Sequence, residues 1–377
     1  MVGTTRVMRI FHTVALVSED GSFGGPTTVA VNLLSELGKR DHSVMLIALW
    51  KGQRSPPRCV GGVEARLFTA QTFVPWFGAL GLFNLRLARF IFSAAKSADI
   101  FHIHAGRDLV TLFTLLTCAL RRVPYVVQTH GMIMPSNRMS VRIFDLALRP
   151  LLRRARTRFF LTDVEDSGLK ALLGAVPLTR LPNGIPLPAP SGERLLAFPA
   201  RVLFLARLHP RKRVESFVAA AALLHSRGLN AEFVVHGPDE GSLDSLLTTI
   251  RNHGLDEVVR YEGALSNIDS LRTLATAHVY VLPSVDEPFP MTLLEALSVG
   301  TPSVCTNSCG IAAILDEHQA AVVTDGSAEK LAAAIDMILS DPASWSSWSK
   351  RAEAGARDLF SISTVVDQLI KTYGGGK

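Results

Sequence analysis

Cysteine is scarce in this sequence. The chain of 377 residues contains four cysteines, Cys59, Cys118, Cys305 and Cys309, which are too few and too scattered for a disulfide framework. Cys305 and Cys309 have the spacing CxxxC without a second pair nearby, so we do not expect a structural zinc site either. We expect the thiols to be small buried side chains and the protein to work in a reducing cytoplasm.

Charge and long apolar runs are also limited. Charged residues make up 19% of the chain and hydrophobic residues 48%, which excludes a disordered polymer and favours well-packed domains. The longest weakly polar stretch, Leu109–Leu120, is about half the length of a membrane span. The N-terminus runs directly into a strand-like segment, so we expect no secretory signal. The length favours two domains over a single core.

The small net charge of +6 is the sum of two halves with charges of opposite sign. Residues 1–185 contain 23 basic and 11 acidic residues, a formal charge of +12, whereas residues 186–377 contain 16 basic and 22 acidic residues, a charge of −6. Such asymmetry indicates that one half meets a partner that the other half does not meet.

Short apolar runs alternate with segments of helical periodicity along most of the chain. This pattern is typical of parallel sheets whose two faces are covered by helices. The expected strands are residues 8–14, 44–49, 99–104, 125–129, 159–162, 202–206, 232–236, 279–283, 302–306 and 321–324. The expected helices include residues 26–37, 214–227 and 329–339.

The alternation is broken at residues 181–201, which contain five prolines and two glycines. Such a composition prevents regular structure and predicts an interdomain linker. We therefore predict two Rossmann-like, doubly wound α/β domains, residues 1–185 and 201–358, joined by a linker over 186–200. A C-terminal helix at about 360–373 is expected to be able to pack back on the first domain. The ligand-binding ends of the two sheets would face a cleft.

Two glycines follow the first expected strand. Gly24–Gly25 precede a helix that is expected to start at Pro26, where free N–H groups would favour an anion. The segment is neither a GxGxxG fingerprint nor a GxxxxGK[ST] loop. A tight turn without a ligand is therefore an open alternative, and a dinucleotide oxidoreductase is disfavoured.

A pair of cations follows the first strand of the second domain. Arg207 and Lys212 are five residues apart, and cations at a strand end of this type can clasp a diphosphate from two sides. Because Arg211 and Arg213 are adjacent, a solvated basic turn is the alternative interpretation.

The most specific pattern is a pair of glutamates. Glu287 lies in the loop after an expected strand, and Glu295 lies eight residues later, on a helix expected to begin near Pro290. Carboxylates at this place can accept hydrogen bonds from sugar and ribose hydroxyls, and the helix N-terminus favours phosphate. A lone helical glutamate would simply be solvated, but two within this frame of strand, loop and helix indicate a binding site.

With these motifs in this order, the sequence resembles the retaining glycosyltransferases of the GT-B fold, family 4. The resemblance covers nearly the whole chain, and it also includes Gly24–Gly25 and an Asn-Gly-Ile hinge at residues 183–185. It implies two Rossmann-like domains and a metal-independent hexosyltransferase that retains the anomeric configuration. The implied donor is a UDP- or GDP-sugar, with no cofactor.

The resemblance also implies roles for the polar residues of the second domain. Arg207 and Lys212 would stabilise the leaving diphosphate in place of a metal. Glu295 would bind the ribose hydroxyls and Glu287 the donor sugar. No protein nucleophile is assigned.

One segment departs from the family pattern. Many members have Gly-Phe-Gly after the first glutamate, whereas this chain has Pro288-Phe289-Pro290. Two N–H donors are lost, so a backbone cradle for phosphate would have to begin at Met291 or Thr292.

Histidines and acidic residues of the first domain need separate interpretation. His130, at the end of an expected strand, matches the family's cleft histidine beside the sugar, with a structural strand-end histidine as the alternative. His102 and His104 alternate on one strand and are interpreted as structural. A solvated loop, rather than a metal site, is expected for the acidic group Asp163, Glu165 and Asp166.

Arginines recur at helical spacing in the basic half. They fall within about 60° of one another on a helical wheel; these residues are Arg138, Arg142, Arg149, Arg153 and Arg156. Apolar residues, Ile143 among them, are expected on the opposite side, and the nearby segment 73–92 is unusually apolar. An arginine stripe beside an apolar segment suits an anionic membrane surface. A buried helix with a solvated basic face is the alternative, and nucleic acid is disfavoured because no aromatic stacking set accompanies the arginines.

The leading hypothesis is a glycosyltransferase of bacterial glycan or glycolipid biosynthesis, acting on a lipid-linked or polysaccharide acceptor. We expect it in the cytoplasm, with peripheral binding to the inner face of the cytoplasmic membrane. The alternatives are a catalytically degenerate GT-B scaffold, an epimerase or a phosphorylase. The sugar, the nucleotide base, the acceptor and the linkage stay open.

Overall fold

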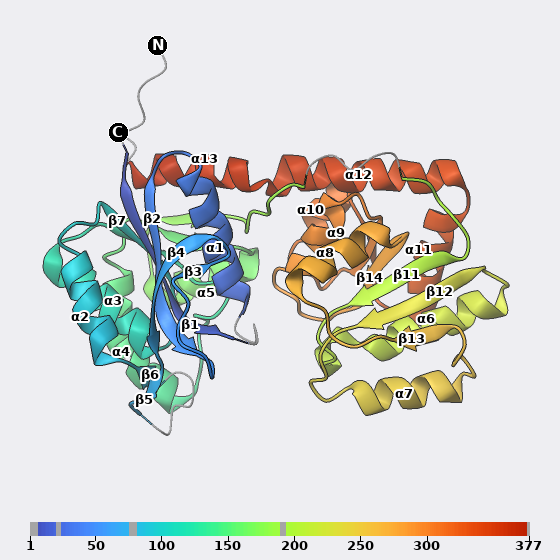
Figure 1. Ribbon diagram of the computed structural model, residues 1–377, viewed down its shortest axis with the longest axis horizontal. Helices are drawn as coiled ribbons and strands as arrows, with labels where there is room; N and C mark the ends of the chain where they lie inside the picture. Colours follow the sequence, from blue (N-terminus) through green and yellow to red (C-terminus); the bar gives the residue numbers. More distant parts are fainter. Residues whose placement is uncertain (1–6, 20–23, 75–80, 189–193, 375–377) are drawn as a thin grey trace, which may run out of the picture. The chain divides into compact units, whose positions relative to one another are not determined.

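The computed structural model describes residues 7–19, 24–74, 81–188 and 194–374 (Figure 1). The chain divides into two compact units. The first comprises Met1–Gly184 together with Ile362–Lys377, and the second comprises Ile185–Ser361. The last helix therefore belongs to the first unit, although it follows the second unit in sequence.

The first unit is built on an eight-stranded sheet with the order β10-β9-β8-β7-β1-β2-β4-β3. Its strands are β1 Arg9–Ser18, β2 Ser43–Lys51, β3 Cys59–Val60, β4 Val63–Thr69, β7 Ile100–His104, β8 Tyr125–Gln128, β9 Arg158–Phe160 and β10 Leu178–Arg180. Neighbours pair in parallel except β3 with β4, which pair antiparallel. Every residue of β7 and β8 is buried, as expected for parallel strands with covered faces. A separate short pair, β5 Gln71–Thr72 and β6 Leu82–Phe83, is antiparallel.

Six helices of the first unit lie within its described residues. They are α1 Gly24–Gly38, α2 Leu85–Ala94, α3 Leu109–Arg121, α4 Met139–Leu152, α5 Asp163–Leu173 and α13 Ile362–Tyr373. Helix α13 contacts α1 and buries an apolar face that ends at Tyr373. Arg40, just beyond α1, forms an ion pair with Asp367 of α13. Helix α13 is therefore attached to this unit by both apolar and polar contacts.

The second unit has a six-stranded sheet, entirely parallel, with the order β13-β12-β11-β14-β15-β16. Its strands are β11 Ala200–Leu205, β12 Ala231–His236, β13 Val259–Tyr261, β14 Val279–Leu282, β15 Ser303–Thr306 and β16 Val322–Thr324. The chain builds outward from β11 to β13 and then returns to the other side of β11. The order of the strands therefore reverses between β11 and β14, and open α/β sheets bind ligands at such a point.

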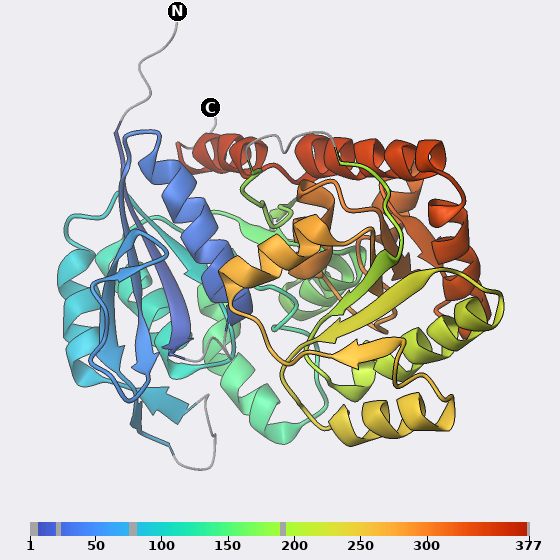
Figure 2. The ribbon, with the colours of Figure 1, turned by 45° about the vertical axis from the view of Figure 1, so that its right-hand side comes forward.

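Helices lie on either side of this second sheet (Figure 2). They are the short η2 Pro210–Lys212, then α6 Val214–Ser226, α7 Leu243–Asn252, α8 Asn267–Thr276, α9 Met291–Ser298, α10 Ala312–Glu317, α11 Ala328–Leu339 and α12 Pro342–Phe360. In the core, the ring of Phe217 from α6 lies 5.7 Å from that of Phe204 and 5.8 Å from that of Phe233. The rings join α6 to the two strands that lead into the ligand-binding edge.

The expected α/β architecture of two parallel-sheet units is confirmed, with several local differences. Helix α1 begins at Gly24 rather than Pro26, so the two glycines form its first turn and are not a loop before it. Helix α12 extends to Phe360, and α13 starts at Ile362. Of the expected linker, residues 189–193 lie outside the described residues, and β11 already begins at Ala200.

The expected arginine stripe is wrong in part. Helix α4 ends at Leu152, and Arg153 is its C-cap, still in helical conformation with its N–H bonded to Arg149 O. Arg156 lies beyond the helix and does not continue its face. Arg156 instead donates a hydrogen bond to the backbone oxygen of Tyr373. Ile143 is 61% exposed and is not part of a buried apolar side. The reason is local: α4 ends at Leu152, four residues before Arg156, and the chain then enters β9 at Arg158.

Candidate active site

The polar residues predicted for the second domain lie beyond the carboxyl ends of β11 and β14. Arg207 follows β11 by two residues, Lys212 ends the short helix η2, and Glu287 lies in the loop between β14 and α9. Because β11 and β14 are neighbours at the reversal of strand order, parallel strands deliver these side chains to one edge of the sheet.

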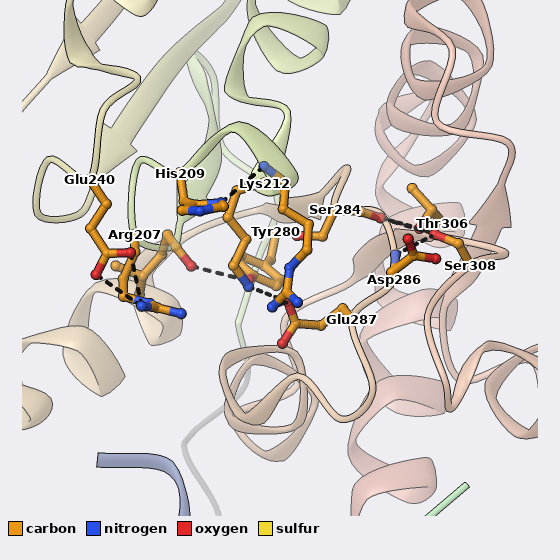
Figure 3. A network of polar contacts seen from close by, with 12 residues as sticks. Arg207, His209, Lys212, Glu240, Tyr280, Ser284, Asp286, Glu287, Thr306 and Ser308 are labelled. Carbon is orange, nitrogen blue, oxygen red and sulfur yellow. Dashed lines mark hydrogen bonds and ion pairs between the residues drawn. The ribbon is translucent and has the colours of Figure 1, made fainter. Parts of the chain in front are cut away.

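Lys212 and Glu287 form a nearly buried ion pair (Figure 3). Lys212 Nζ donates to Glu287 Oε2, and the two side chains are only 11% and 13% exposed. Arg211 Nη2 lies 3.6 Å from the same oxygen. The helix η2 that carries both cations is capped by His209, whose Nδ1 accepts a hydrogen bond from Arg211 N at 3.2 Å. Lys212 therefore belongs to a site that is ordered by specific contacts and is not part of a solvated basic turn.

The loop that carries Glu287 is tied down on both sides. Val285 N donates to Arg211 O at 2.9 Å, and Gly310 N donates to Glu287 O at 2.8 Å. Asp286, between them, has a left-handed φ of 51°, and its N–H donates to Ser308 Oγ at 3.3 Å. A strained, non-glycine conformation held by such contacts is typical of functional loops.

Glu295 lies in the second turn of α9, which begins at Met291 as expected. Pro290, before it, gives no side-chain hydrogen bond to the first N–H groups, so no side chain caps the positive end of the helix. Phe289 fixes the approach to this end, because its buried ring packs edge-on against Phe360. Burial raises the pKa of Glu295 from 4.5 to about 7.

The hydroxyl of Tyr280 on β14 is influenced by the charges of both glutamates. This buried hydroxyl donates to Leu205 O at 3.2 Å. Its pKa is well above the usual range, first because of burial and then because of the charges of Glu287 and Glu295. The charges of both carboxylates therefore influence this one hydroxyl, which indicates that the glutamate pair lies in the same region of the second unit.

Arg207 is bound to an acidic residue that the sequence did not single out. Its Nη1 donates to both carboxylate oxygens of Glu240, at 2.9 and 2.8 Å, and Figure 3 shows this pair beside the Lys212–Glu287 pair. The Arg207 side chain is 53% exposed. Exposed ion pairs contribute about 0–1 kcal/mol, so an anionic ligand can compete for this guanidinium.

In the first unit, His130 lies two residues beyond β8 in a left-handed turn. Its φ is 50°, and that of Gly131 is 74°. The carboxylate of Glu165 on α5 holds this turn, because Thr129 Oγ1 and Gly131 N both donate to Glu165 Oε1, the latter at 2.6 Å. Leu161 N donates to the other oxygen at 2.7 Å. Glu165 is 2% exposed, so the expected solvated loop is wrong at this residue.

The His130 ring is hydrogen-bonded on its inner side to His104, with 2.8 Å between His130 Nε2 and His104 Nδ1. Desolvation lowers the pKa of His130 to about 3, so the ring is neutral at neutral pH. Its outer nitrogen, Nδ1, has no hydrogen-bond partner within the described part of the chain, and the residue is partly exposed. Gly25, in the same unit, is exposed and has open space where a Cβ would be.

Sequence reasoning did not single out Glu240 and Tyr280, and it gave Arg211 and Glu165 no role in these arrangements. Tyr280 lies on a predicted strand and Glu165 where a solvated loop was expected, and a single sequence does not distinguish such buried polar side chains from exposed ones. Glu240 lies 33 residues from its partner, and no spacing rule connects two loops that follow neighbouring strands.

Two family models match this chain. The model described as "Glycosyl transferase 4-like domain" matches residues 24–184, and the one described as "Glycosyl transferases group 1" matches residues 197–355. The glycogen synthase of Mycobacterium tuberculosis is 30% identical over 181 residues, 48% of this chain and 43% of the relative. The D-inositol 3-phosphate glycosyltransferase of an Arthrobacter species is 28% identical over 201 residues, 49% of this chain and 48% of the relative. The matched region thus spans less than half the length of these curated relatives.

Solved structures match over nearly the full chain. HepE of Anabaena, crystallised in complex with UDP, superposes with a TM-score of 0.75 at 18% identity, covering 97% of this chain and 100% of HepE. Sucrose-phosphate synthase of Thermosynechococcus elongatus gives a TM-score of 0.73 at 17% identity over 97% of this chain and 98% of its own. At such identities the structural likeness shows the fold alone, and the assignment of the chain to a family rests on the two family models. The chain belongs to the group 1 glycosyltransferases and has their GT-B architecture of two Rossmann-like domains.

Proposed function

We propose that this protein transfers a hexosyl unit from a nucleotide-diphosphate sugar to a lipid-linked or polysaccharide acceptor, with retention of configuration and without a metal. The observation that carries the proposal is the buried Lys212–Glu287 ion pair at the reversal of strand order, beside Glu295 and the uncapped start of α9. A diphosphate needs fixed positive charge, and a sugar and a ribose need hydrogen-bond acceptors. This edge of the sheet offers both.

In the proposed reaction, the bond between the sugar C1 and the phosphate oxygen breaks, and its electron pair goes to the leaving diphosphate. Lys212 and Arg207 stabilise that developing charge, together with N–H groups at Met291 and Thr292. The acceptor hydroxyl attacks C1 on the face from which the phosphate departs, and its proton goes to the leaving group. Glu295 binds the ribose hydroxyls, Glu287 binds the donor sugar, and His130 and Gly24–Gly25 contribute from the first domain.

The donor nucleotide is the part of the proposal that can be tested first. We expect a nucleotide sugar at 100 times its Kd to stabilise the protein by about 2.7 kcal/mol, which for a domain of this size raises Tm by about 5–10 °C. A thermal-shift panel of UDP, GDP, ADP and their glucose conjugates measures this, and UDP is the first choice because HepE was crystallised with it. Uridine, which lacks the diphosphate, is the control. A flat response to every nucleotide would contradict the proposal.

Turnover separates a transferase from the alternatives. A degenerate scaffold would bind a nucleotide without releasing the diphosphate, and an epimerase would change the sugar without an acceptor. We expect the nucleoside diphosphate to be released from the donor in a manner that depends on the acceptor, which a coupled assay for UDP or GDP detects.

Membrane binding belongs to the same proposal, and helix α4 supports it. Met139, Ile143 and Leu146 follow one another at helical spacing and are 67%, 61% and 74% exposed, and exposed arginines flank them at 138, 142 and 149. We call these six residues the α4 surface. An exposed apolar ridge between arginines suits the headgroup region of an anionic bilayer. No helix in the described part of the chain is long and apolar enough to span a membrane. The association that we propose is peripheral, on the cytoplasmic face of the membrane.

Liposome co-sedimentation tests the α4 surface. We expect binding to vesicles that contain anionic lipid and its loss at high salt, because screening removes the arginine contribution. Arg142→Gln should weaken the partition coefficient about fivefold, since one arginine near the surface contributes about 1 kcal/mol. Ile143→Ser should weaken it as well. Met337→Ser, on α11 of the other unit and 43% exposed, is the matched control. Equal binding to neutral and anionic vesicles would overturn the idea.

A further inference from the structure

A chain of hydrogen bonds runs through the interior of the first unit and ends at His130. Tyr373 of α13 contacts His12 of β1, with 3.2 Å between the hydroxyl and Nε2. His12 Nδ1 lies 3.0 Å from His104 Nε2, and His104 Nδ1 lies 2.8 Å from His130 Nε2. A branch joins the Tyr373 hydroxyl to His102 Nδ1 at 2.6 Å. Four of the five residues are fully buried, and only His130 reaches solvent.

The same histidines would suit a metal by composition, because His12, His102 and His104 offer nitrogens within 4.8 Å of one another. Ring geometry opposes this interpretation. The rings of His102 and His104 are parallel within 5° and stacked at 4.6 Å. A nitrogen lone pair lies in the plane of its ring, so one metal would have to lie in two parallel planes at once. The arrangement is therefore a hydrogen-bonded chain and not a preformed metal site.

The number of protons on the rings requires all the hydrogen bonds between Tyr373 and His130 to run in one direction. Burial lowers the pKa of His12 to about 3 and those of His102 and His104 well below the usual range, so the rings are neutral. A neutral imidazole has one N–H donor and one acceptor nitrogen. Once the proton is placed on one ring of the chain, the tautomer of each following ring is fixed.

Two observations select the direction. The 2.6 Å contact between Tyr373 and His102 Nδ1 has the length of a strong O–H donor bond, and the 3.2 Å contact with His12 Nε2 that of an N–H bond. Tyr373 then donates to His102, whose proton is on Nε2. Gln128 Oε1 and His102 Nε2 are both buried atoms without a hydrogen-bond partner, Gln128 Nε2 donates to Asn183, and the Gln128 side chain raises the pKa of His102. A proton on His102 Nε2 offers Gln128 Oε1 the kind of donor that it lacks, whereas the reverse order would leave two buried acceptors, His102 Nε2 and Gln128 Oε1, without any donor.

Following that order along the chain, His12 donates from Nε2 to Tyr373, His104 donates from Nε2 to His12, and His130 donates from Nε2 to His104. We propose that Tyr373, His12 and His104 are positioning residues that hold His130 as the Nε2–H tautomer, so that its outer Nδ1 is a fixed hydrogen-bond acceptor for a ligand hydroxyl. Glu165 holds the backbone of the same turn, and the chain holds its ring. That the hydroxyl belongs to a sugar rests on the proposed function, whereas the tautomer does not.

The tautomer is read directly from long-range ¹H–¹⁵N correlation spectra of histidine-labelled protein without any ligand, with His130→Asn used to assign the signal. We expect an unprotonated Nδ1 and a protonated Nε2 at His130. Tyr373→Phe removes the hydroxyl that directs the chain and should give a mixture of both tautomers. His12→Leu interrupts the chain at another place and should do the same. In the transfer assay, the loss of one directed hydrogen bond should reduce kcat/KM by roughly three- to tenfold.

Tyr125→Phe is the matched control. Tyr125 is another buried tyrosine of the same unit, and its hydroxyl donates to Leu151 O at 2.6 Å, outside the chain. It should lose comparable stability and leave the His130 spectrum unchanged. A wild-type His130 protonated on Nδ1, or a His130 signal unaffected by both Tyr373→Phe and His12→Leu, would overturn the proposal. Absence of transfer with every nucleotide sugar would instead count against the proposed function and leave the spectroscopic result standing.

Discussion

Replacing Lys212 by methionine is expected to reduce transfer by about 10²–10³-fold, the usual effect of deleting one preorganised group that stabilises developing charge. The Lys212 side chain is 11% exposed and fixed on η2, so water does not replace its ammonium group at low cost. Glu287→Gln should cause a loss of similar size, because it removes the charge that fixes Lys212 and a strong acceptor for the sugar. Steady-state rates of diphosphate release measure both. Turnover near the wild-type level in either variant would remove the site assignment.

The two variants should differ in stability, and this difference tests the pairing itself. Breaking a buried ion pair leaves one charge without its partner, which costs about 3 kcal/mol. After Lys212→Met, Glu287 still has Arg211 at 3.6 Å. After Glu287→Gln, Lys212 has no carboxylate among the contacts of the described residues. We therefore expect Glu287→Gln to unfold at lower denaturant than Lys212→Met, and the double variant to be more stable than the two single changes predict by addition. Lys350→Met, an exposed lysine on α12, controls for loss of a charge.

The fold could be predicted from sequence because its signals are local. Buried parallel strands are short apolar runs, and the ten expected runs coincide with strands to within a few residues. The short strands β3, β5, β6, β10 and β13 were missed because they are two or three residues long and mostly exposed or partly exposed. The seven-residue strand β4 was missed as well, because buried and exposed residues are mixed along it and it forms no continuous apolar run. No local sequence pattern indicates the strand order, which places Arg207 and Glu287 at one edge of the sheet.

The candidate site was predictable only where its residues share one strand–loop–helix segment. Glu287 and Glu295 do so, and the helix expected to begin near Pro290 begins at Met291. The contacts that hold Arg207 and the His130 turn join side chains 33 to 36 residues apart. The chain from Tyr373 to His12 joins residues 361 apart. These contacts depend on which elements become neighbours, and that is decided by the packing of whole sheets.

The last prediction concerns Glu295 and pH. Its folded-state pKa of about 7 is above the unfolded value of 4.5, so between these pH values the folded protein holds a proton that the unfolded chain releases. The stabilising effect of that proton is present below about pH 4.5 and is lost as pH rises through 7. At pH 8, Glu295→Gln should therefore be more stable than the wild type by on the order of 2–3 kcal/mol, measured by denaturant unfolding. Glu257→Gln, at an exposed position, should have no such effect.

If Glu295 binds the ribose as proposed, ligand binding should reverse the preference, because the ribose hydroxyls would donate to the ionised carboxylate. Below pH 7 the nucleotide sugar must displace the proton, so its affinity should fall by about tenfold per pH unit toward pH 5 and be constant above pH 8. UDP-glucose suits the measurement, since its diphosphate has no proton that titrates in this range. Calorimetry at pH 6 in two buffers of different ionisation enthalpy should show release of one proton. Glu295→Gln should bind weakly at every pH and release none. A wild-type affinity independent of pH would show that Glu295 is either ionised before binding or not in contact with the ligand, and the raised pKa would then have no role in donor recognition.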